Sequence, residues 1–353
     1  MRTLRLSVDA NDLDSAASRL AVERAAEILR QGGTVAFPTE TVYGLGANAL
    51  DAAAIAKIFE AKQRPSWDPL IVHVSDMRML ERVVANVPQN AERLIDVFWP
   101  GPLTLLLPKH AGIPDIVTAS RAKVGVRMPQ HPVAQALIRA AGVPVAAPSA
   151  NTFGRISPTS AMHVVEDLEG RIDAILDAGE TTHGLESTVV DPSEDPCIVY
   201  RPGVVTLEQI RAVCVGVVAF QEAHIFQQAL PQSLPSPGVG LRHYAPRAKL
   251  ILIDGGGKEQ LRAFEAAVKQ AASSGQKLGL MLPDTFQSAA TGKQAHIYRW
   301  GEWSDEEELA QRLFAGLRQL DAEGVSVIVC PLPSKKGLGA AMRDRLKKAA
   351  RTE

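Results

Sequence analysis

Hydroxyl side chains and glycines are concentrated in residues 34–50, TVAFPTETVYGLGANAL. The segment begins as a strand that its apolar residues predict to be buried, and Thr39 and Thr41 follow where that strand ends. Their hydroxyls are able to donate hydrogen bonds to a polar or anionic ligand. Gly44 and Gly46 carry no Cβ, so we expect them to let the backbone approach such a ligand closely.

A compact set of basic residues follows in residues 57–74, KIFEAKQRPSWDPLIVHV. Lys57 and Lys62 lie on a predicted helix, Arg64 comes just after it, and His73 lies inside the next strand. Taken alone, this pattern is explained more simply by a solvated helix face and a buried structural histidine than by an anion site.

Arg127 lies in VGVRMP, a predicted strand of otherwise apolar residues. An unpaired guanidinium buried there would be very unfavourable, so Arg127 needs an anionic partner. A buried Asp or Glu and a ligand carboxylate or phosphate are equally good partners, because the planar guanidinium suits all of them.

Three further motifs place polar residues where predicted strands end, which is where open α/β sheets bind ligands. They are APSAN with Ser149 and Asn151, GLESTVV with Ser187 and Thr188, and YRPG with Arg201. Ser and Asn after a strand are also typical of simple turns. Hydroxyls, amides and arginines that converge on strand ends nevertheless suit a phosphate-bearing ligand better than an apolar one.

Strand-length apolar runs alternate with helix-period segments along the chain, which predicts a layered α/β fold. The first predicted helix covers residues 14–33 and ends in two glycines. A helix over residues 132–141 has Pro at its first turn and Gly142 just past its end. Ser157 is expected to open another helix, and residues 206–209 form a capping box that opens one more.

The chain is long enough for about two domains, and its composition is that of a globular protein, with 353 residues of which 46% are hydrophobic. The first domain is predicted to cover residues 1–213. Residues 214–247 are rich in Pro, Gly, Ser and Gln and are predicted to be a linker. Residues 248–353 show the pattern of a smaller βαβ unit.

Charge and cysteine content exclude several classes of protein. Lys and Arg number 38 against 39 Asp and Glu, so net charge does not indicate a nucleic-acid or membrane partner. Cys197, Cys214 and Cys330 are too few and too scattered for a disulfide framework or a metal cluster. Because the sequence also shows no signal-peptide or membrane-spanning pattern, we expect a cytoplasmic protein.

Seven motifs follow one another in order: GGTVAFPTETVYGLG, AKQRPSWDPLIVHV, WPGPLTLLL, VGVRMP, APSAN, GLESTVV and RPG. In that order they resemble the YrdC-like threonylcarbamoyl-AMP synthases, over residues from about 20 to 213. HYAP at residues 243–246 and the unit after it resemble the linker and C-terminal domain of the two-domain form. The resemblance implies a YrdC-like twisted open sheet with helices, followed by a smaller Rossmann-like α/β domain.

The resemblance implies a nucleotidyltransferase that joins L-threonine, bicarbonate and ATP into L-threonylcarbamoyl-AMP and releases pyrophosphate. The expected downstream partner is a tRNA threonylcarbamoyl transferase, which modifies the adenosine beside the anticodon. The chain itself is not required to bind tRNA. Mg²⁺ is expected with ATP, held largely by phosphate oxygens and water, and no protein metal site is expected.

The resemblance also implies which residues bind the substrates. Attack of a threonine carbamate on the α-phosphate depends on placement and charge neutralisation, and Lys62 and Arg64 are the expected catalytic residues. The expected L-threonine ligands are Thr39, His73, Arg127 and Ser187, of which Arg127 holds the carboxylate. The expected ATP ligands are Lys62, Arg64, Thr118, Ser149, Asn151, Ser157, Arg201 and Tyr244.

Tyr244 lies in the linker, which is long for a simple joint and combines an aromatic residue with basic ones. We expect the linker segment SPGVGLRHYAP to close over the first domain as a lid that shields the labile acyl-adenylate from water. The alternative is a passive tether whose HYAP motif docks against the second domain.

Two local features depart from known patterns. Ser120, in TASRAKVGVRMP, stands where members of the family commonly have glycine, so the backbone there is an open question. DGGGKEQ follows a strand and opens a helix, but it has neither the Walker ending nor the dinucleotide spacing, and we expect no second nucleotide site.

Two activities from other classes compete with the synthase. A nucleic-acid-binding module is opposed by the neutral net charge and the few aromatic residues. A carbamoyl-adenylate-forming enzyme of hydrogenase maturation would come with zinc-binding cysteine clusters and an acylphosphatase-like domain, which the sequence does not show. The three activities are separated by their requirements. The synthase depends on threonine, the hydrogenase-maturation enzyme depends on carbamoyl phosphate, and the nucleic-acid-binding module retains RNA without turnover.

Overall fold

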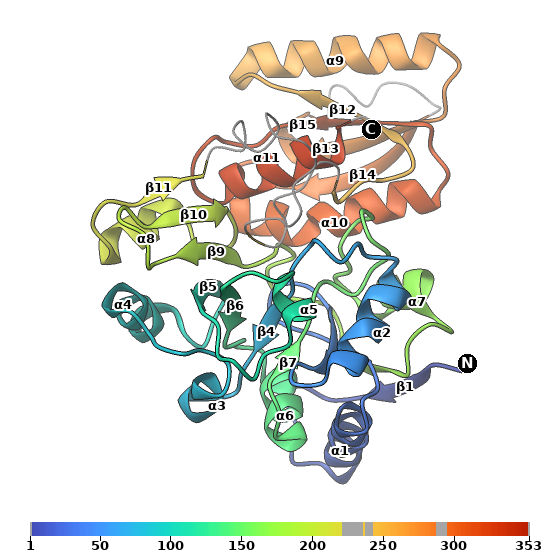
Figure 1. Cartoon of the computed structure of the whole chain (residues 1–353). Helices are drawn as coiled ribbons and strands as arrows, with labels where there is room; N and C mark the ends of the chain where they lie inside the picture. The colour runs from blue at the N-terminus through green and yellow to red at the C-terminus, as the bar shows by residue number, and fades with distance from the viewer. Residues whose placement is uncertain (1, 221–235, 237–242, 287–294, 352–353) are drawn as a thin grey trace. The chain divides into compact units, whose positions relative to one another are not determined.

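The computed structural model of the protein describes residues 2–220, 236, 243–286 and 295–351. The chain divides into two compact units (Figure 1). Residues Leu241–Glu353 make up most of the second unit, which also contains two short pieces from earlier in the chain, Gly154–Ile156 and His183–Leu185. The expected lid, SPGVGLRHYAP at residues 236–246, falls largely on residues 237–242, outside the described residues.

A mixed, open β-sheet forms the centre of the first unit. In the described part of the chain its eleven strands have the order β1-β8-β2-β3-β7-β4-β6-β5-β9-β10-β11. The strands are β1 (Leu4–Ser7), β2 (Val35–Phe37), β3 (Gly44–Asn48), β4 (Ile71–His73), β5 (Leu103–Pro108), β6 (Lys123–Arg127), β7 (Val145–Ala146), β8 (Ala174–Asp177), β9 (Thr188–Asp191), β10 (Ile198–Arg201) and β11 (Val218–Ala219).

The helices of the first unit begin and end at local sequence signals. Gly142 follows α6 with a φ of 67°, a left-handed value that glycine adopts without strain. Thr206 and Gln209 make both hydrogen bonds of the predicted capping box. α1 and α6 pack side by side (Figure 1). The helices are α1 (Ala16–Arg30), α2 (Ala52–Lys62), α3 (Met77–Glu81), α4 (Gln89–Phe98), α5 (Asp115–Thr118), α6 (Pro132–Ala141), α7 (Ala161–Leu168) and α8 (Leu207–Val213).

The helix expected at Ser157 starts later than predicted. α7 begins at Ala161, and the hydroxyl of Ser160 accepts a hydrogen bond from the His163 backbone as its N-cap. The carbonyl of Pro158, in the segment before Ser160, accepts a hydrogen bond from the Tyr43 backbone at 2.9 Å. The prediction that Ser157 opens a helix is therefore wrong.

The two glycines after the hydroxyl-rich loop are explained by sheet packing. Gly44 and Gly46 belong to β3, which pairs antiparallel with β2. A Cβ on Gly46 would lie 2.7 Å from side-chain atoms of both Phe37 and Val145, closer than real contacts allow. A Cβ on Gly44 would approach Ala147 to 3.3 Å. Approach of a ligand is not needed to explain either glycine.

Parallel neighbours in this sheet bring predicted site residues to the same level. β4 and β6 are parallel, and their last residues, His73 and Arg127, are directly paired. Both residues therefore lie at the carboxyl ends of their strands, where open α/β sheets bind ligands.

A parallel sheet forms the centre of the second unit, with four strands in its described part in the order β12-β15-β13-β14. Phe264, Leu280 and Val329 are buried in its core. The strands are β12 (Lys249–Ile253), β13 (Leu278–Pro283), β14 (Ala295–Gly301) and β15 (Val327–Pro331), and the helices are α9 (Gly257–Ser273), α10 (Glu306–Ala322) and α11 (Gly337–Ala349). The two units together confirm the predicted α/β fold class. Across the described residues, each helix is too short or too polar to cross a membrane.

Candidate active site

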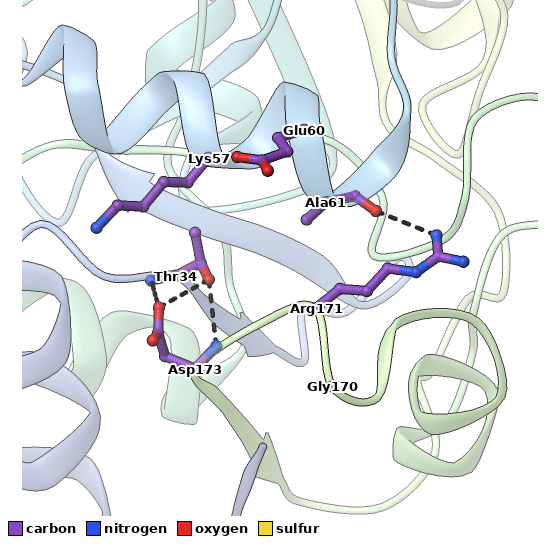
Figure 2. A pocket seen from close by; sticks show the side chains of 7 residues that line it. All are labelled: Thr34, Lys57, Glu60, Ala61, Gly170, Arg171 and Asp173. Atoms are coloured by element: carbon purple, nitrogen blue, oxygen red, sulfur yellow. Dashed lines mark hydrogen bonds between the residues drawn. The ribbon is translucent and has the colours of Figure 1, made fainter. Parts of the chain in front are cut away.

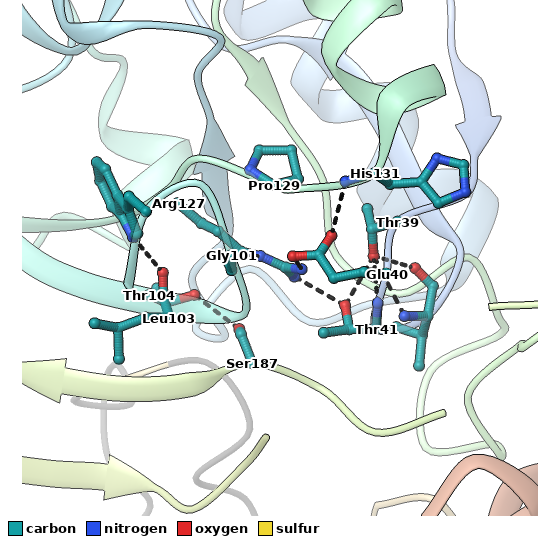
Figure 3. Close-up of polar contacts among 12 residues, drawn as sticks. Thr39, Glu40, Thr41, Gly101, Leu103, Thr104, Arg127, Pro129, His131 and Ser187 are labelled. Carbon is teal, nitrogen blue, oxygen red and sulfur yellow. Dashed lines mark hydrogen bonds and ion pairs between the residues drawn. The ribbon is translucent and has the colours of Figure 1, made fainter. Parts of the chain in front are cut away.

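Arg127 is held from three sides inside the first unit (Figure 3). Its Nε donates to the carbonyl of Gly101 at 3.2 Å, and its Nη1 donates to Thr41 Oγ1 at 2.9 Å. Its Nη2 lies 2.7 Å from Glu40 Oε1, and the two side chains are only 4% and 6% exposed. A buried carboxylate of the protein is thus a partner of Arg127, which is one of the two kinds of partner that the sequence allows.

The ion pair between Arg127 and Glu40 is not a complete hydrogen bond. Among the described residues, neither Nη2 nor Oε1 has a hydrogen-bond partner, although the two atoms are close, because the N–H groups are poorly aligned with the oxygen. Burial acts to raise the pKa of Glu40, but Arg127 and backbone N–H groups outweigh it, so that pKa is lowered and Glu40 is ionised. Arg127 is therefore charge-balanced, and because Nη2 carries two hydrogens, at least one of them remains available to another acceptor.

The hydroxyls of Thr39 and Thr41 form a directed chain. Arginine has only donors, so Thr41 Oγ1 accepts a hydrogen bond from Arg127. The Thr39 hydroxyl lies 2.8 Å from Thr41 Oγ1, and because Thr39 gives its own hydrogen to a backbone carbonyl, Thr41 is the donor between the two hydroxyls. Thr39 in turn donates to the carbonyl of Val42 at 2.7 Å. Both hydroxyl hydrogens are used within the protein, and donation to a ligand requires one of these bonds to break.

His73 is a buried, neutral neighbour of Arg127. Burial and the charge of Arg127 lower the pKa of its imidazole to about 3. Its Nδ1 has no hydrogen-bond partner among the described residues. Buried polar atoms are nearly always hydrogen-bonded, so this Nδ1, on the residue paired with Arg127 in the sheet, indicates a place for a polar ligand group.

Ser187 connects Arg201 to the central strands. Arg201 donates from Nε and Nη2 to the carbonyl of Ser187, at 3.1 and 2.9 Å, and from Nη2 to Ser187 Oγ at 3.1 Å. Ser187 Oγ is also 2.8 Å from Oγ1 of Thr104, on β5. Sequence reasoning missed Thr104, because a single hydroxyl inside an apolar strand carries no distinctive signal.

Lys62 joins two of the predicted motifs. Its Nζ donates to the carbonyls of Ser149 and Asn151, at 2.6 and 2.5 Å. Burial, helped by the nearby charge of Arg64, places the pKa of Lys62 well below its ordinary value. APSAN is therefore in direct contact with the lysine expected to act on ATP.

Three of the expected ATP ligands surround one buried carboxylate. Arg64 Nη2 lies 2.8 Å from Asp68 Oδ2. Burial raises the pKa of Asp68, and the charges of Arg64, Lys62 and Arg201 oppose that rise. Sequence reasoning missed Asp68, although several basic residues in a buried region require such an anion.

Two further expected ATP ligands of the first unit are Ser157, in a loop, and Thr118, the last residue of α5. Ser157 Oγ donates to Glu186 Oε1 at 2.6 Å, and Glu186 is a second buried carboxylate that sequence reasoning missed. Thr118 is buried at the end of α5, with its hydroxyl turned toward the carbonyl of Asp115 at 3.5 Å. Ser120, two residues later, has a φ of 61°. The serine thus keeps the left-handed conformation for which glycine is favoured.

Tyr244 is buried within the second unit. Its ring stacks on that of Phe314 at a centroid distance of 5.7 Å, and the guanidinium of Arg345 lies 5.2 Å from the centre of the Tyr244 ring. This is the contact expected if HYAP docks against the second domain. A contact between Tyr244 and ATP stays a prediction.

A cavity of about 500 Å³ lies elsewhere in the first unit, between α2 and the segment before β8 (Figure 2). Lys57 Nζ donates to the carbonyl of Gly32 at 2.7 Å, and Asp173 accepts hydrogen bonds from the backbone and hydroxyl of Thr34. The lining residues are Thr34, Lys57, Glu60, Ala61, Gly170, Arg171 and Asp173. None of them is an expected substrate ligand, so this cavity is not the candidate active site.

Two family descriptions match the chain. One, described as "Telomere recombination", matches residues 27–203, and the other, described as "Threonylcarbamoyl-AMP synthase, C-terminal domain", matches residues 205–351. Threonylcarbamoyl-AMP synthase from Pyrococcus abyssi is 43% identical, over 92% of this chain and 93% of its own length. The synthase from Bacillus subtilis is 40% identical, over 99% of this chain and 98% of its own length.

The chain belongs to the threonylcarbamoyl-AMP synthase family. A crystal structure of P. abyssi Sua5 complexed with L-threonine superposes with a TM-score of 0.90 at 40% identity, covering 99% of this chain and 98% of that one. Membership in this family confirms the predicted nucleotidyltransferase activity in tRNA modification and decides against both rival activities.

Proposed function

We propose that Arg127, His73, Thr39 and Ser187 bind L-threonine in this chain. The observation that carries this assignment is that two buried atoms on neighbouring strands, His73 Nδ1 and Arg127 Nη2, make no hydrogen bond within the described residues, although Nη2 is ion-paired with Glu40. A substrate carboxylate on Nη2 would complete the donor set of Arg127 with a charge-assisted hydrogen bond. Nδ1 of the neutral imidazole would donate a hydrogen bond to the ligand in one tautomer and accept one in the other.

The phosphates of ATP are proposed to bind where Lys62, Arg64 and Arg201 converge. Bicarbonate first carboxylates the threonine amine, which forms a carbamate and releases water. A carbamate oxygen then attacks the α-phosphate, and the bond to pyrophosphate breaks. The carbamate is already an anionic nucleophile, so the basic side chains act mainly by placing the phosphates and neutralising their charge.

Mg²⁺ is proposed to enter with ATP. The described residues contain no group of three or more His, Cys, Asp or Glu side chains arranged to hold a metal ion. Independently of that, Mg²⁺ with ATP is expected to be held largely by phosphate oxygens and water. When bound, Mg²⁺ would neutralise charge on the pyrophosphate leaving group. The remaining assignments, Thr118, Ser149, Asn151, Ser157 and Tyr244 to ATP, rest on the sequence resemblance.

The product is proposed to pass to a tRNA threonylcarbamoyl transferase in the cytoplasm, so that this chain need not bind tRNA. Pyrophosphate release, measured with L-threonine, bicarbonate and ATP omitted in turn, tests the reaction. Release should require all three, because the nucleophile exists only after carboxylation. Threonine-dependent release that persists in carbonate-free buffer would contradict the proposal.

A further inference from the structure

Glu40 is a buried carboxylate at the candidate threonine site that the proposed mechanism does not use. It lies in the loop between β2 and β3, between Thr39 and Thr41, and is 4% exposed. Figure 3 shows its carboxylate between the guanidinium of Arg127 and the backbone of His131. Oε1 is 2.7 Å from Arg127 Nη2, and Oε2 accepts a long hydrogen bond from His131 N at 3.4 Å.

Glu40 and Thr41 hold opposite ends of the same guanidinium. Thr41 accepts from Nη1, while Glu40 stands beside Nη2. The carbonyl of Gly101 fixes Nε, so the plane of the guanidinium is set by three contacts. Two of the three come from one short loop, and any change in that loop should therefore turn the guanidinium of Arg127.

The poor alignment of the ion pair gives Glu40 a particular effect. A buried guanidinium without a counter-charge would be drawn toward water or toward another anion. Glu40 supplies the counter-charge, yet the Nη2 hydrogens are not used in a hydrogen bond to Oε1. Glu40 is thus able to attract Arg127 while leaving at least one Nη2 hydrogen for a substrate carboxylate.

We propose that Glu40 is a positioning residue, which holds the Arg127 guanidinium with Nη2 ready for the carboxylate of the amino-acid substrate. The inference rests on the proposed role of Arg127 in binding threonine. Glu40 acts through Arg127 and not as a base, since its carboxylate remains ionised and weakly basic beside the guanidinium. Its removal should therefore affect threonine binding more than the chemical step.

Glu40→Gln tests the proposal, because the amide keeps the shape of the side chain and removes its charge. We expect the Kd and KM for L-threonine to rise about 10- to 100-fold, a loss typical of one charged hydrogen bond. kcat at saturating threonine and the Kd for ATP should stay within about threefold. Equal losses for ATP and threonine, or wild-type threonine affinity, would overturn the proposal.

Glu40→Asp keeps the test decisive if Glu40→Gln does not fold. The shorter carboxylate keeps the charge but withdraws it from Nη2, so we expect the Kd for L-threonine to rise above that of wild type, with ATP affinity unchanged. Asp173→Asn is the matched control, because it makes the same kind of change in the first unit outside the candidate site. It should leave threonine affinity unchanged. Wild-type threonine affinity in Glu40→Asp would contradict the proposed dependence on distance.

A double-mutant cycle with Arg127→Ala separates this inference from the proposed function. If Glu40 acts through Arg127, adding Glu40→Gln to Arg127→Ala should cost little further threonine affinity. Additive losses would overturn the positioning role. If Arg127→Ala bound threonine normally, the proposed role of Arg127 itself would fail. If Arg127→Ala lost threonine while Glu40→Gln kept it, only the positioning role would fail.

Discussion

Lys62 makes the clearest prediction at the scale of single residues. Lys62→Ala removes the ammonium that lies against Ser149 and Asn151 and is proposed to act on the phosphates. We expect kcat/KM for ATP to fall at least about 100-fold, while threonine affinity changes less than about threefold.

Lys57 provides the matched control for this prediction, since it lies on the same helix but lines the separate cavity. Lys57→Ala should retain near wild-type kinetics. Steady-state kinetics and calorimetry with each ligand measure both variants. An equal loss in Lys57→Ala and Lys62→Ala would indicate damage to α2 and not a role in chemistry.

His73 predicts a pH effect on stability. The folded protein lowers the pKa of His73 to about 3, whereas a free histidine titrates near 6.5. Below about pH 6.5 the unfolded state therefore binds a proton that the folded state does not. The contribution of neutral His73 to the free energy of unfolding is therefore complete above about pH 6.5. It is lost progressively as the pH falls toward 3, by at most about 1.4 kcal/mol per pH unit.

NMR of ring-labelled histidine checks the underlying titration. The His73 signals, assigned by their absence from His73→Gln, should not titrate between pH 8 and pH 5. A midpoint near pH 6.5 for those signals would show that the ring is not buried as the structure has it.

At the scale of elements, the turn between α5 and β6 stores backbone strain. Ala119 and Ser120 follow one another with φ values of 50° and 61°, and a non-glycine residue in this region costs about 1–2 kcal/mol. Ser120→Gly should raise the free energy of unfolding by about 1 kcal/mol.

Gly142 offers the reverse substitution, from glycine to a residue with a Cβ at a left-handed position. Its φ is 67°, and an added Cβ would meet nothing within 4 Å. Gly142→Ala should therefore lose about 1 kcal/mol for conformational reasons alone. Urea unfolding of the two variants beside wild type measures both changes. Destabilisation by Ser120→Gly would mean that the serine side chain contributes more than its strained backbone costs.

At the scale of the whole molecule, the linker is the open question. A lid predicts that a chain ending after β11, near residue 220, still folds its first unit but makes less threonylcarbamoyl-AMP or loses more of it to hydrolysis. A tether predicts full activity. Pyrophosphate release and product hydrolysis, measured on the truncated and complete chains, distinguish them. Equal turnover and equal product retention would contradict the lid.

The sequence alone was sufficient for the family, the fold class and most helix ends. These depend on local patterns, such as the glycine after α6 and the capping box at Thr206, where the physical causes act over about four residues. At Ser157 the local signal misled: the helix begins after Ser160, and the neighbouring carbonyl of Pro158 accepts a hydrogen bond from distant Tyr43.

Only the tertiary structure decided the partners of the buried charged groups. The sequence requires an anion for Arg127, but it does not show which one. The contacts of Arg127 come from Glu40 and Thr41, and Thr41 lies 86 positions earlier in the chain. The sequence likewise contains many carboxylates, and nothing in it identifies Asp68 as the one that Arg64, Lys62 and Arg201 share. Burial makes such pairing obligatory, whereas the choice of partner follows from strand order and register, which bring distant positions of the chain together.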